Sequence, residues 1–410
     1  MKTWMKVLCA LLAVLMLSGC SLIEKYYMRP ATGEVTQQEP TGDGGIHIYG
    51  DEDIFFSGGK LEELMDKVDE CFIGESDRAT MEDAAAAAII ESLGDRWSYY
   101  IPASELQGYN ETMNNSYVGI GITIQVREDE TGFDVVAVEK TGPAYEAGLL
   151  PGDKLTKANG QEVAPLGTDG AAAIIKGEEG TTVEVSVERD GQELTFTVER
   201  RTILVTVAEA ELIEGNIGLV TINNFDARCF EETKACIENM IAQGATALIF
   251  DVRFNPGGYA HEMVALLDYL LPEGEVFITE DYLGNRDVES SDANCLQMPM
   301  AVLVNGDSYS AAEFFASALR DYEWATVVGE QTVGKGYFQT TIMLSDGSAI
   351  NLSVGKYYTR SGISLAEQGG LTPDEVVEVS DEMYLDIYYD KVSNEEDPQL
   401  QKAIEVVRGK

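Results

Sequence analysis

The sequence predicts an α/β chain built from several domains, and three observations support this. With 410 residues, 45% of them hydrophobic, the chain has room for two or three packed domains. Two mostly apolar runs, 247–252 and 300–304, suit strands that are buried on both faces of a sheet, and a helical pattern follows each run. Residues 113–202 instead alternate short strand-like runs with glycine-containing turns, which indicates a separate β-rich module.

The N-terminus has the features of a targeting segment over residues 1–20. Two lysines precede an apolar run from Val7 to Leu17, which is short for a transmembrane helix. Leu17-Ser18-Gly19-Cys20 is similar to a bacterial lipobox, in which the cysteine thiol is acylated. A plain signal peptide is the alternative. We expect Cys20 to anchor the protein to the cell membrane, outside the cytoplasm, without a membrane-spanning helix.

The rest of the chain divides by composition and periodicity. Residues 21–55 are rich in Gly, Pro, Thr, Gln and acidic residues and have no apolar period, as expected for a flexible tether. The further segments are a helical region at 56–112, the β-rich module at 113–202, an α/β core at 203–380 and a helical tail at 381–410.

Charge and metal-ligand content exclude several classes of function. A net charge of −43 argues against nucleic-acid binding and against adsorption to anionic lipid through a basic patch. The six cysteines include no C-x-x-C pair, and the two histidines are far apart in the sequence, so we expect neither a metal site nor a cofactor. Cys71, Cys229, Cys236 and Cys295 are interpreted as mostly buried, unpaired side chains.

If the protein is a hydrolase, its general base is not expected to be histidine. His47 lies in the predicted tether, and His261 lies at a probable helix start, where a structural or solvent-facing role is commoner. Lysine is the remaining base. Its pKa is ordinarily near 10.4, and burial lowers the pKa because desolvation penalises the charged form.

A candidate nucleophile follows the second buried run. The strand-like segment 301–304 leads into a turn that ends at Ser310, and an amphipathic helix begins there. Free N–H groups and the helix dipole at such a junction stabilise negative charge, which is what an oxyanion requires. The structural alternative is a helix N-cap, which either Ser308 or Ser310 could supply.

Two glycine-containing segments provide possible partners. Lys335 lies between glycines at the start of a probable strand, and the run Asp251–Gly258 ends the first buried strand in a turn that could offer N–H groups. Residues 329–335 also satisfy the phosphate-loop pattern G-x-x-x-x-G-K. A phosphate loop continues with Ser or Thr and a helix, whereas Gly336 and a strand-like run follow here. This spacing disfavours nucleotide binding.

These segments together resemble the C-terminal processing, or tail-specific, serine peptidases. Ser308-Tyr309-Ser310-Ala311-Ala312-Glu313 is similar to the family's Ser-x-Ser-Ala-x-Glu run, Lys335 follows Ser310 by 335 − 310 = 25 positions, and Gln339 follows Lys335 by four. Arg-Phe-Asn-Pro-Gly-Gly at 253–258 is similar to the family's oxyanion loop. The resemblance covers roughly residues 60–380, and Tyr309 and Ala312 depart from the usual Ala and Ser.

The resemblance implies a role for each matched residue. Ser310 would be the nucleophile, Lys335 the base and Gln339 the group that orients the lysine, while the N–H of Ala311 and that of Gly257 or Gly258 would hold the oxyanion. It also implies a core of the crotonase-like α/β fold. In a straight strand, Lys335 and Gln339 would stand about 13 Å apart. We therefore predict that the chain curls at the glycines that flank the lysine.

The β-rich module resembles a PDZ domain. Gly119-Ile120-Gly121-Ile122, a later Gly-Pro-Ala helix start and a Gly-Asp turn occur in the expected order. Such domains bind the C-terminus of a chain by strand addition. The resemblance implies that 120–122 receives the terminal carboxylate, that 122–125 is the pairing edge, and that Ala173 or Ile174 on a helix at 170–176 faces the groove.

The sequence therefore predicts a lipid-anchored serine endopeptidase that captures the C-terminal tails of protein substrates with its PDZ domain. A catalytically silent PDZ adaptor is the alternative, although both Ser310 and Lys335 are present. The terminal helical segments are candidates for homodimer contacts.

Overall fold

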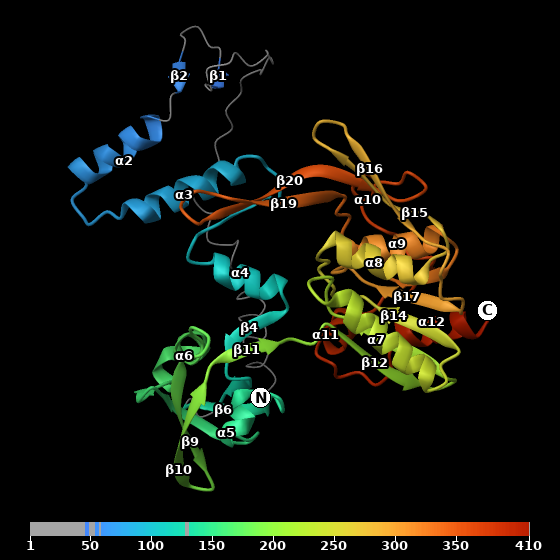
Figure 1. Ribbon diagram of the computed structural model, residues 1–410, viewed down its shortest axis with the longest axis horizontal. Helices are drawn as coiled ribbons and strands as arrows, with labels where there is room; N and C mark the ends of the chain where they lie inside the picture. Colours follow the sequence, from blue (N-terminus) through green and yellow to red (C-terminus); the bar gives the residue numbers. More distant parts are fainter. Residues whose placement is uncertain (1–45, 49–53, 57–58, 128–130, 410) are drawn as a thin grey trace. The chain divides into compact units, whose positions relative to one another are not determined.

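The computed structural model describes residues 46–48, 54–56, 59–127 and 131–409 (Figure 1). The predicted lipid site, Cys20, lies outside these residues. The chain forms two compact units, one up to Met81 and the other from Glu82. Within the described residues, no helix has the length and apolar character needed to cross a membrane.

The first unit contains a short β-ladder and a helix. Strands β1 (Ile46–Ile48) and β2 (Ile54–Phe56) pair antiparallel inside the segment that we expected to be a flexible tether. Isoleucine and phenylalanine favour strands, which accounts for this difference. Helix α2 (Gly59–Cys71) has no buried side chain, and Cys71 is exposed rather than buried as expected. Helix α3 (Arg78–Glu91) begins in this unit and continues into the second.

A six-stranded sheet is the centre of the second unit, in the order β12-β13-β14-β17-β18-β21. All neighbours are parallel except the edge pair β12 and β13. The two apolar runs of the sequence are its central strands, which confirms the predicted α/β core. The strands are β12 (Ala208–Ile213), β13 (Ile217–Ile222), β14 (Ala247–Asp251), β17 (Met300–Val304), β18 (Ala325–Gly329) and β21 (Glu375–Val376).

Helices cover both faces of this sheet because alternate residues of its strands point in opposite directions. Leu248 and Phe250 face α7 (Cys229–Ala242), α8 (Ala260–Leu270) and α9 (Ala311–Asp321). Ile249 faces α12 (Pro398–Arg408), which buries Leu400 and Ile404. The predicted C-terminal tail is thus partly a layer of the core; α10 (Leu365–Gln368) and α11 (Asp381–Tyr388) precede α12.

A second sheet has the order β16-β15-β20-β19, and β3 also pairs with β20. Its strands are β3 (Tyr99–Ile101), β15 (Gly274–Asp281), β16 (Arg286–Ser291), β19 (Tyr337–Met343) and β20 (Ala349–Tyr358). The predicted helical region 56–112 therefore also donates a strand to the core, before helix α4 (Leu106–Met113). Its short aromatic run, Tyr99 to Ile101, forms that strand.

The PDZ-like module has its own sheet, in the order β10-β9-β7-β6-β5, and its own apolar core. Its elements are β5 (Ile122–Val126), β6 (Phe133–Val138), α5 (Pro143–Ala147), β7 (Lys154–Ala158), β8 (Gln161–Glu162), the 3₁₀ turn η1 (Ala164–Leu166), α6 (Gly167–Ile175), β9 (Thr182–Arg189) and β10 (Gln192–Glu199). The chain enters and leaves through the paired strands β4 (Ser116–Gly119) and β11 (Arg201–Leu204).

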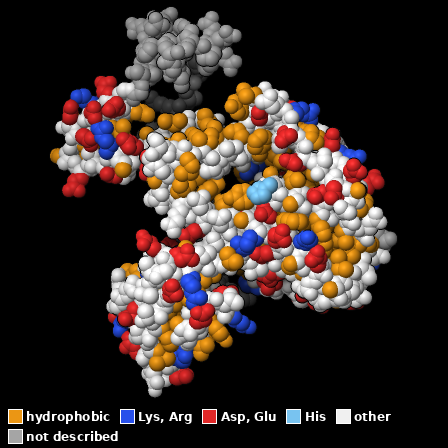
Figure 2. Space-filling view, in the orientation of Figure 1, with side chains coloured by type: hydrophobic (Ala, Val, Ile, Leu, Met, Phe, Trp, Pro, Cys, Tyr) orange, Lys and Arg blue, Asp and Glu red, His pale blue; other side chains and the backbone are white. Residues whose placement is uncertain are grey.

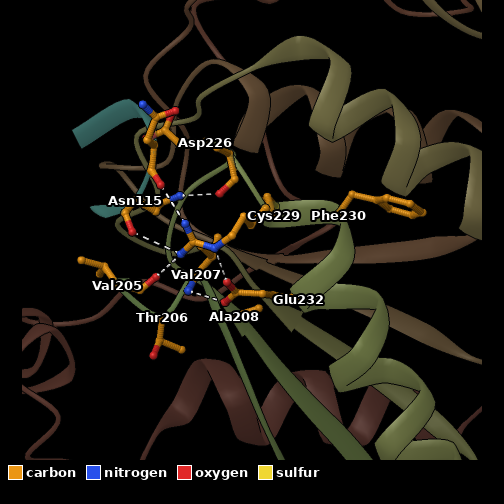
Figure 3. Close-up of polar contacts among 12 residues, drawn as sticks. Asn115, Val205, Thr206, Val207, Ala208, Asp226, Cys229, Phe230 and Glu232 are labelled. Carbon is orange, nitrogen blue, oxygen red and sulfur yellow. Dashed lines mark hydrogen bonds and ion pairs between the residues drawn. The ribbon is translucent and has the colours of Figure 1, made fainter. Parts of the chain in front are cut away.

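An arginine joins these two connecting segments to the α/β core. Arg228 precedes α7 and donates hydrogen bonds to the backbone carbonyls of Asn114, Asn115 and Val205 and to the carboxylate of Glu232. Figure 3 shows Asn115, Val205 and Glu232 converging from three segments. This cluster fixes both connections at the same end of α7.

The surface agrees with the acidic composition. Figure 2 shows acidic side chains spread over the visible face with basic side chains among them, as on a solvated protein surface.

Candidate active site

Ser310 lies at the junction between β17 and α9. Its backbone is in the left-handed region, at φ 60° and ψ −124°, and it occupies the N-cap position of α9. Such a backbone is costly for a residue other than glycine, and it is often found at functional sites. Ser308 is not the cap: its buried hydroxyl donates to the carbonyl of Val252 at 2.7 Å and so fixes the turn that carries Ser310.

Glu313 connects the serine segment to the lysine segment. Its buried carboxylate accepts hydrogen bonds from the N–H groups of Ser310 at 3.0 Å, Gly334 at 2.6 Å and Lys335 at 2.9 Å, and from the hydroxyl of Thr332. Sequence reasoning matched Glu313 to a motif but gave it no role. The Ser-x-x-Glu spacing of a capping box was the available signal.

Lys335 lies in an irregular segment just before β19. Burial is the largest cause that lowers the pKa of its ammonium group, to about 8, and the nearby Arg96 cation acts in the same direction. The Asp95 and Glu313 carboxylates oppose this shift. Its Nζ atom lies 4.7 Å from the centre of the Trp97 ring, and among the described residues no hydrogen bond joins it to Ser310.

Contrary to our prediction, the chain does not curl back at the glycines around Lys335 to bring the lysine to Gln339. The lysine stands outside the strand, and β19 has an irregular register between Phe338 and Gln339. The Gln339 amide donates to the Tyr337 carbonyl and to the Ser353 hydroxyl, both at 3.1 Å, rather than contacting the lysine. The role of Gln339 as orienting group therefore stays a prediction.

Through Ser353, Gln339 is connected to the loop that carries Trp97. The N–H of Ser353 donates to the Ser98 hydroxyl at 3.0 Å, and that hydroxyl donates to Asp95 at 2.6 Å. The loop 95–98 thus forms a wall around the lysine that the sequence did not indicate.

Two backbone N–H groups are available next to Ser310. The Gly257 N–H donates to the Asn255 side chain at 2.8 Å, whereas neither Gly258 nor Ala311 donates its N–H to another described residue. A Cβ atom on Gly257 would approach Ser310 Cβ to 2.6 Å, so only glycine permits this close contact. The geometry favours Gly258 over Gly257 as the second oxyanion donor.

Ser310, Lys335, Gln339 and both glycines line one cavity of about 540 Å³. Its other lining residues are mostly apolar or aromatic, and they include Met263, Phe277, Phe314, Phe338 and Tyr357. A larger cavity of about 710 Å³ surrounds the buried ion pairs of Arg253 with Asp251 and Asp397, and it lacks both Ser310 and Lys335. The first cavity is therefore the one that contains the predicted catalytic residues.

His261 is not among the residues that line this cavity, and its side chain is 74% exposed at the start of α8. His47 lies in β1 of the first unit. Within the described ranges, no group of three or more His, Cys, Asp or Glu side chains could hold a metal ion.

The predicted tail-binding edge of the PDZ-like module is open. Strand β5 is the last strand of its sheet, and among the described residues it pairs with β6 alone, which leaves its other edge for strand addition. Gly121, in the loop before it, has φ 77°. Ile122, Ile124 and Ile174 of α6 are half-buried around this edge, whereas Ala173 is exposed.

Comparisons with known proteins agree with this geometry. The profile of peptidase family S41 matches residues 216–377, and a PDZ-domain profile matches residues 118–199. The carboxy-terminal processing protease CtpA of Bacillus subtilis is 30% identical over 325 residues, which cover 78% of this chain and 69% of that protein. The chain belongs to the C-terminal processing serine peptidases.

Other members of the peptidase family are similar to a comparable extent. A probable CtpA-like serine protease of Staphylococcus epidermidis is 31% identical over 77% of this chain and 64% of its own length. The solved structure of a putative S41 protease from Bacteroides fragilis is 18% identical, with a TM-score of 0.50 over 79% of this chain and 90% of that one, and so supports the fold alone.

Proposed function

We propose that this protein is a serine endopeptidase that cleaves extracytoplasmic proteins near their C-termini with a Ser310–Lys335 dyad. The observation that carries the proposal is the shared cavity, in which a strained serine and a buried lysine of lowered pKa are held together through Glu313. The finer assignment of the core to the crotonase-like fold is part of the proposal.

The chemistry would follow from the positions of these groups. The neutral Lys335 amine takes the Ser310 hydroxyl proton as Oγ attacks the scissile carbonyl, and the N–H groups of Ala311 and Gly258 receive the oxyanion. The proton passes to the leaving amine, and water then hydrolyses the acyl-enzyme. For the first step, Lys335 Nζ must leave the Trp97 ring and come within hydrogen-bond distance of Ser310 Oγ.

Gln339 would assist by accepting a hydrogen bond from the lysine through its carbonyl oxygen, since the structure engages its amide nitrogen elsewhere. The PDZ module would receive a substrate tail along β5, with its carboxylate at Gly119-Ile120-Gly121-Ile122, and would gate the peptidase. Acylation of Cys20 would hold the enzyme at the outer face of the cell membrane.

One observation favours the alternative of a silent, lipid-anchored PDZ adaptor: the absence of a Ser310–Lys335 hydrogen bond among the described residues. Labelling the detergent-solubilised full chain with a fluorophosphonate separates the two. Labelling that requires Ser310, and that Ser310→Ala and Lys335→Ala abolish, is expected of the peptidase. A chain that stays unlabelled when C-terminal peptides are added, yet binds them, would be the adaptor.

A further inference from the structure

A buried carboxylate lines the active-site cavity without a role in the proposed mechanism. Asp226 lies in the loop between β13 and α7, and its side chain is 7% exposed. Its backbone is fixed on both sides: its N–H donates to Asn224 Oδ1 at 3.0 Å, and its carbonyl accepts from the N–H of Cys229 at 3.1 Å. The side chain is therefore held at the cavity wall by the loop itself.

The Asp226 carboxylate has no hydrogen-bond or ion-pair partner among the described residues, and burial alone raises its pKa to about 7. Its oxygens are not among the fully enclosed polar atoms of the described residues, so they stay accessible from the cavity. An unpaired carboxylate that is accessible only from a binding cavity is suited to a cationic group that arrives with the ligand.

Aromatic side chains surround this carboxylate. Tyr99, Tyr109, Tyr259 and Tyr309 line the same cavity, and the Tyr99 and Tyr109 rings pack edge to face at 6.4 Å. Burial raises the pKa of Tyr99, Tyr259 and Tyr309, and the charge of Asp226 adds to the effect in each. Because aromatic faces attract cations, a carboxylate among tyrosines is a site for a positive group.

The basic residues of the cavity lie at Trp97. Arg96 and Lys335 are 4.1 Å and 4.7 Å from the centre of the Trp97 ring, and among the described residues neither forms an ion pair with Asp226. Tyr309, whose ring packs on Trp97 at 5.7 Å between centroids, lies near both Arg96 and Asp226. The Asp226 carboxylate is thus not neutralised by the basic residues of the cavity.

The acidic side is also close to the reacting atoms. A Cβ atom built on Gly257 would lie 2.6 Å from Ser310 Cβ, and one on Gly258 would lie 2.5 Å from the Asp226 nitrogen. Two consecutive glycines therefore lie between Ser310 and the backbone of Asp226, and the Asp226 side chain lines the same cavity as Ser310. A substrate bound with its scissile carbonyl at Ser310 would place a nearby side chain at Asp226.

We infer that Asp226 and the surrounding tyrosines form a subsite for one lysine or arginine side chain of the substrate, close to the scissile bond. The inference rests on the proposed function and narrows it: the preferred tails would carry a basic residue near the cleavage point, in addition to the C-terminal residues that the PDZ module binds.

The test is a positional scan with fluorogenic peptides that share one C-terminal sequence. Each position near the scissile bond carries Lys, Met or Glu in turn, and kcat/KM is measured with the detergent-solubilised full chain. At one position we expect the Lys-to-Met ratio to be about tenfold or more, the size typical of one specific contact. In Asp226→Asn the ratio should fall to about one to two, and in Asp226→Lys the Glu peptide should be preferred.

Glu231→Gln is the matched control, since it removes one negative charge from an exposed residue of α7 outside the cavity. It should keep the wild-type ratio. Because each ratio is taken within a single variant, a general loss of activity does not affect it. No preference for Lys at any position, or an equal preference in Asp226→Asn, would overturn the subsite.

A binding measurement separates this inference from the proposed function and does not depend on the folding of Asp226 variants. Ser310→Ala cannot form an acyl-enzyme, and its Kd for the Lys and Met peptides reports recognition alone. Tighter binding of the Lys peptide supports the subsite even if the wild-type enzyme cleaves nothing, which would contradict only the peptidase. Equal Kd values would overturn the subsite even where cleavage is efficient.

Discussion

Replacing Glu313 by glutamine should damage both the stability and the active site. The carboxylate accepts from two donors on each oxygen: Ser310 and Lys335 on one, Thr332 and Gly334 on the other. An amide keeps one acceptor oxygen and turns an NH₂ group towards two buried donors. Each unsatisfied buried group costs about 1–3 kcal/mol, so we expect a loss of roughly 2–6 kcal/mol in the free energy of unfolding.

The rate of reaction at Ser310 should fall as well, because the Glu313 carboxylate fixes the distance between the serine and lysine segments. A displacement of about 1 Å can cost about 10²-fold in rate. Urea unfolding and the rate of fluorophosphonate labelling of Glu313→Gln measure the two effects. Glu323→Gln is the control, because this residue is exposed and its side chain makes no hydrogen bond to another described residue; it should change stability by less than about 0.5 kcal/mol. A Glu313→Gln protein within 1 kcal/mol of wild type and labelled at the same rate would refute the reasoning.

Three further predictions follow from single contacts. In the proposed mechanism Lys335 acts as a neutral base, and its pKa is lowered to about 8, so kcat/KM should rise with pH through about 8; a profile that is flat from pH 6 to 10 would contradict the lysine base. Gly258→Ala should lower Tm by several degrees, since the added Cβ would come within 2.3 Å of the Phe225 backbone. An unchanged Tm in calorimetry would show that the loop around Gly258 moves to accept the methyl group at no cost in stability. Asp397→Ala should cost more than about 1 kcal/mol in urea unfolding, because it removes one of the two carboxylate partners of the buried Arg253 side chain and also the side-chain cap of α12; a loss well below this would mean that neither contact contributes to stability.

The sequence by itself determined the α/β core, the order of the modules and the family. The two apolar runs predicted strands covered on both faces, which the sheet confirms, and the spacing of Ser310 and Lys335 within a set of motifs indicated the family. These features can be predicted locally, because the burial of a strand and the residues of a turn depend on consecutive positions in the sequence.

Only the tertiary structure decided what surrounds the reacting groups. Trp97 and Asp226 are separated from Lys335 by more than a hundred residues, and no periodicity in their own segments indicates that they line the same cavity. The preference for Gly258 over Gly257 in the proposed oxyanion hole likewise depends on a side chain, because the Gly257 N–H donates to Asn255. Such contacts arise from packing between segments that are distant in the sequence, so no local pattern in a single sequence predicts them.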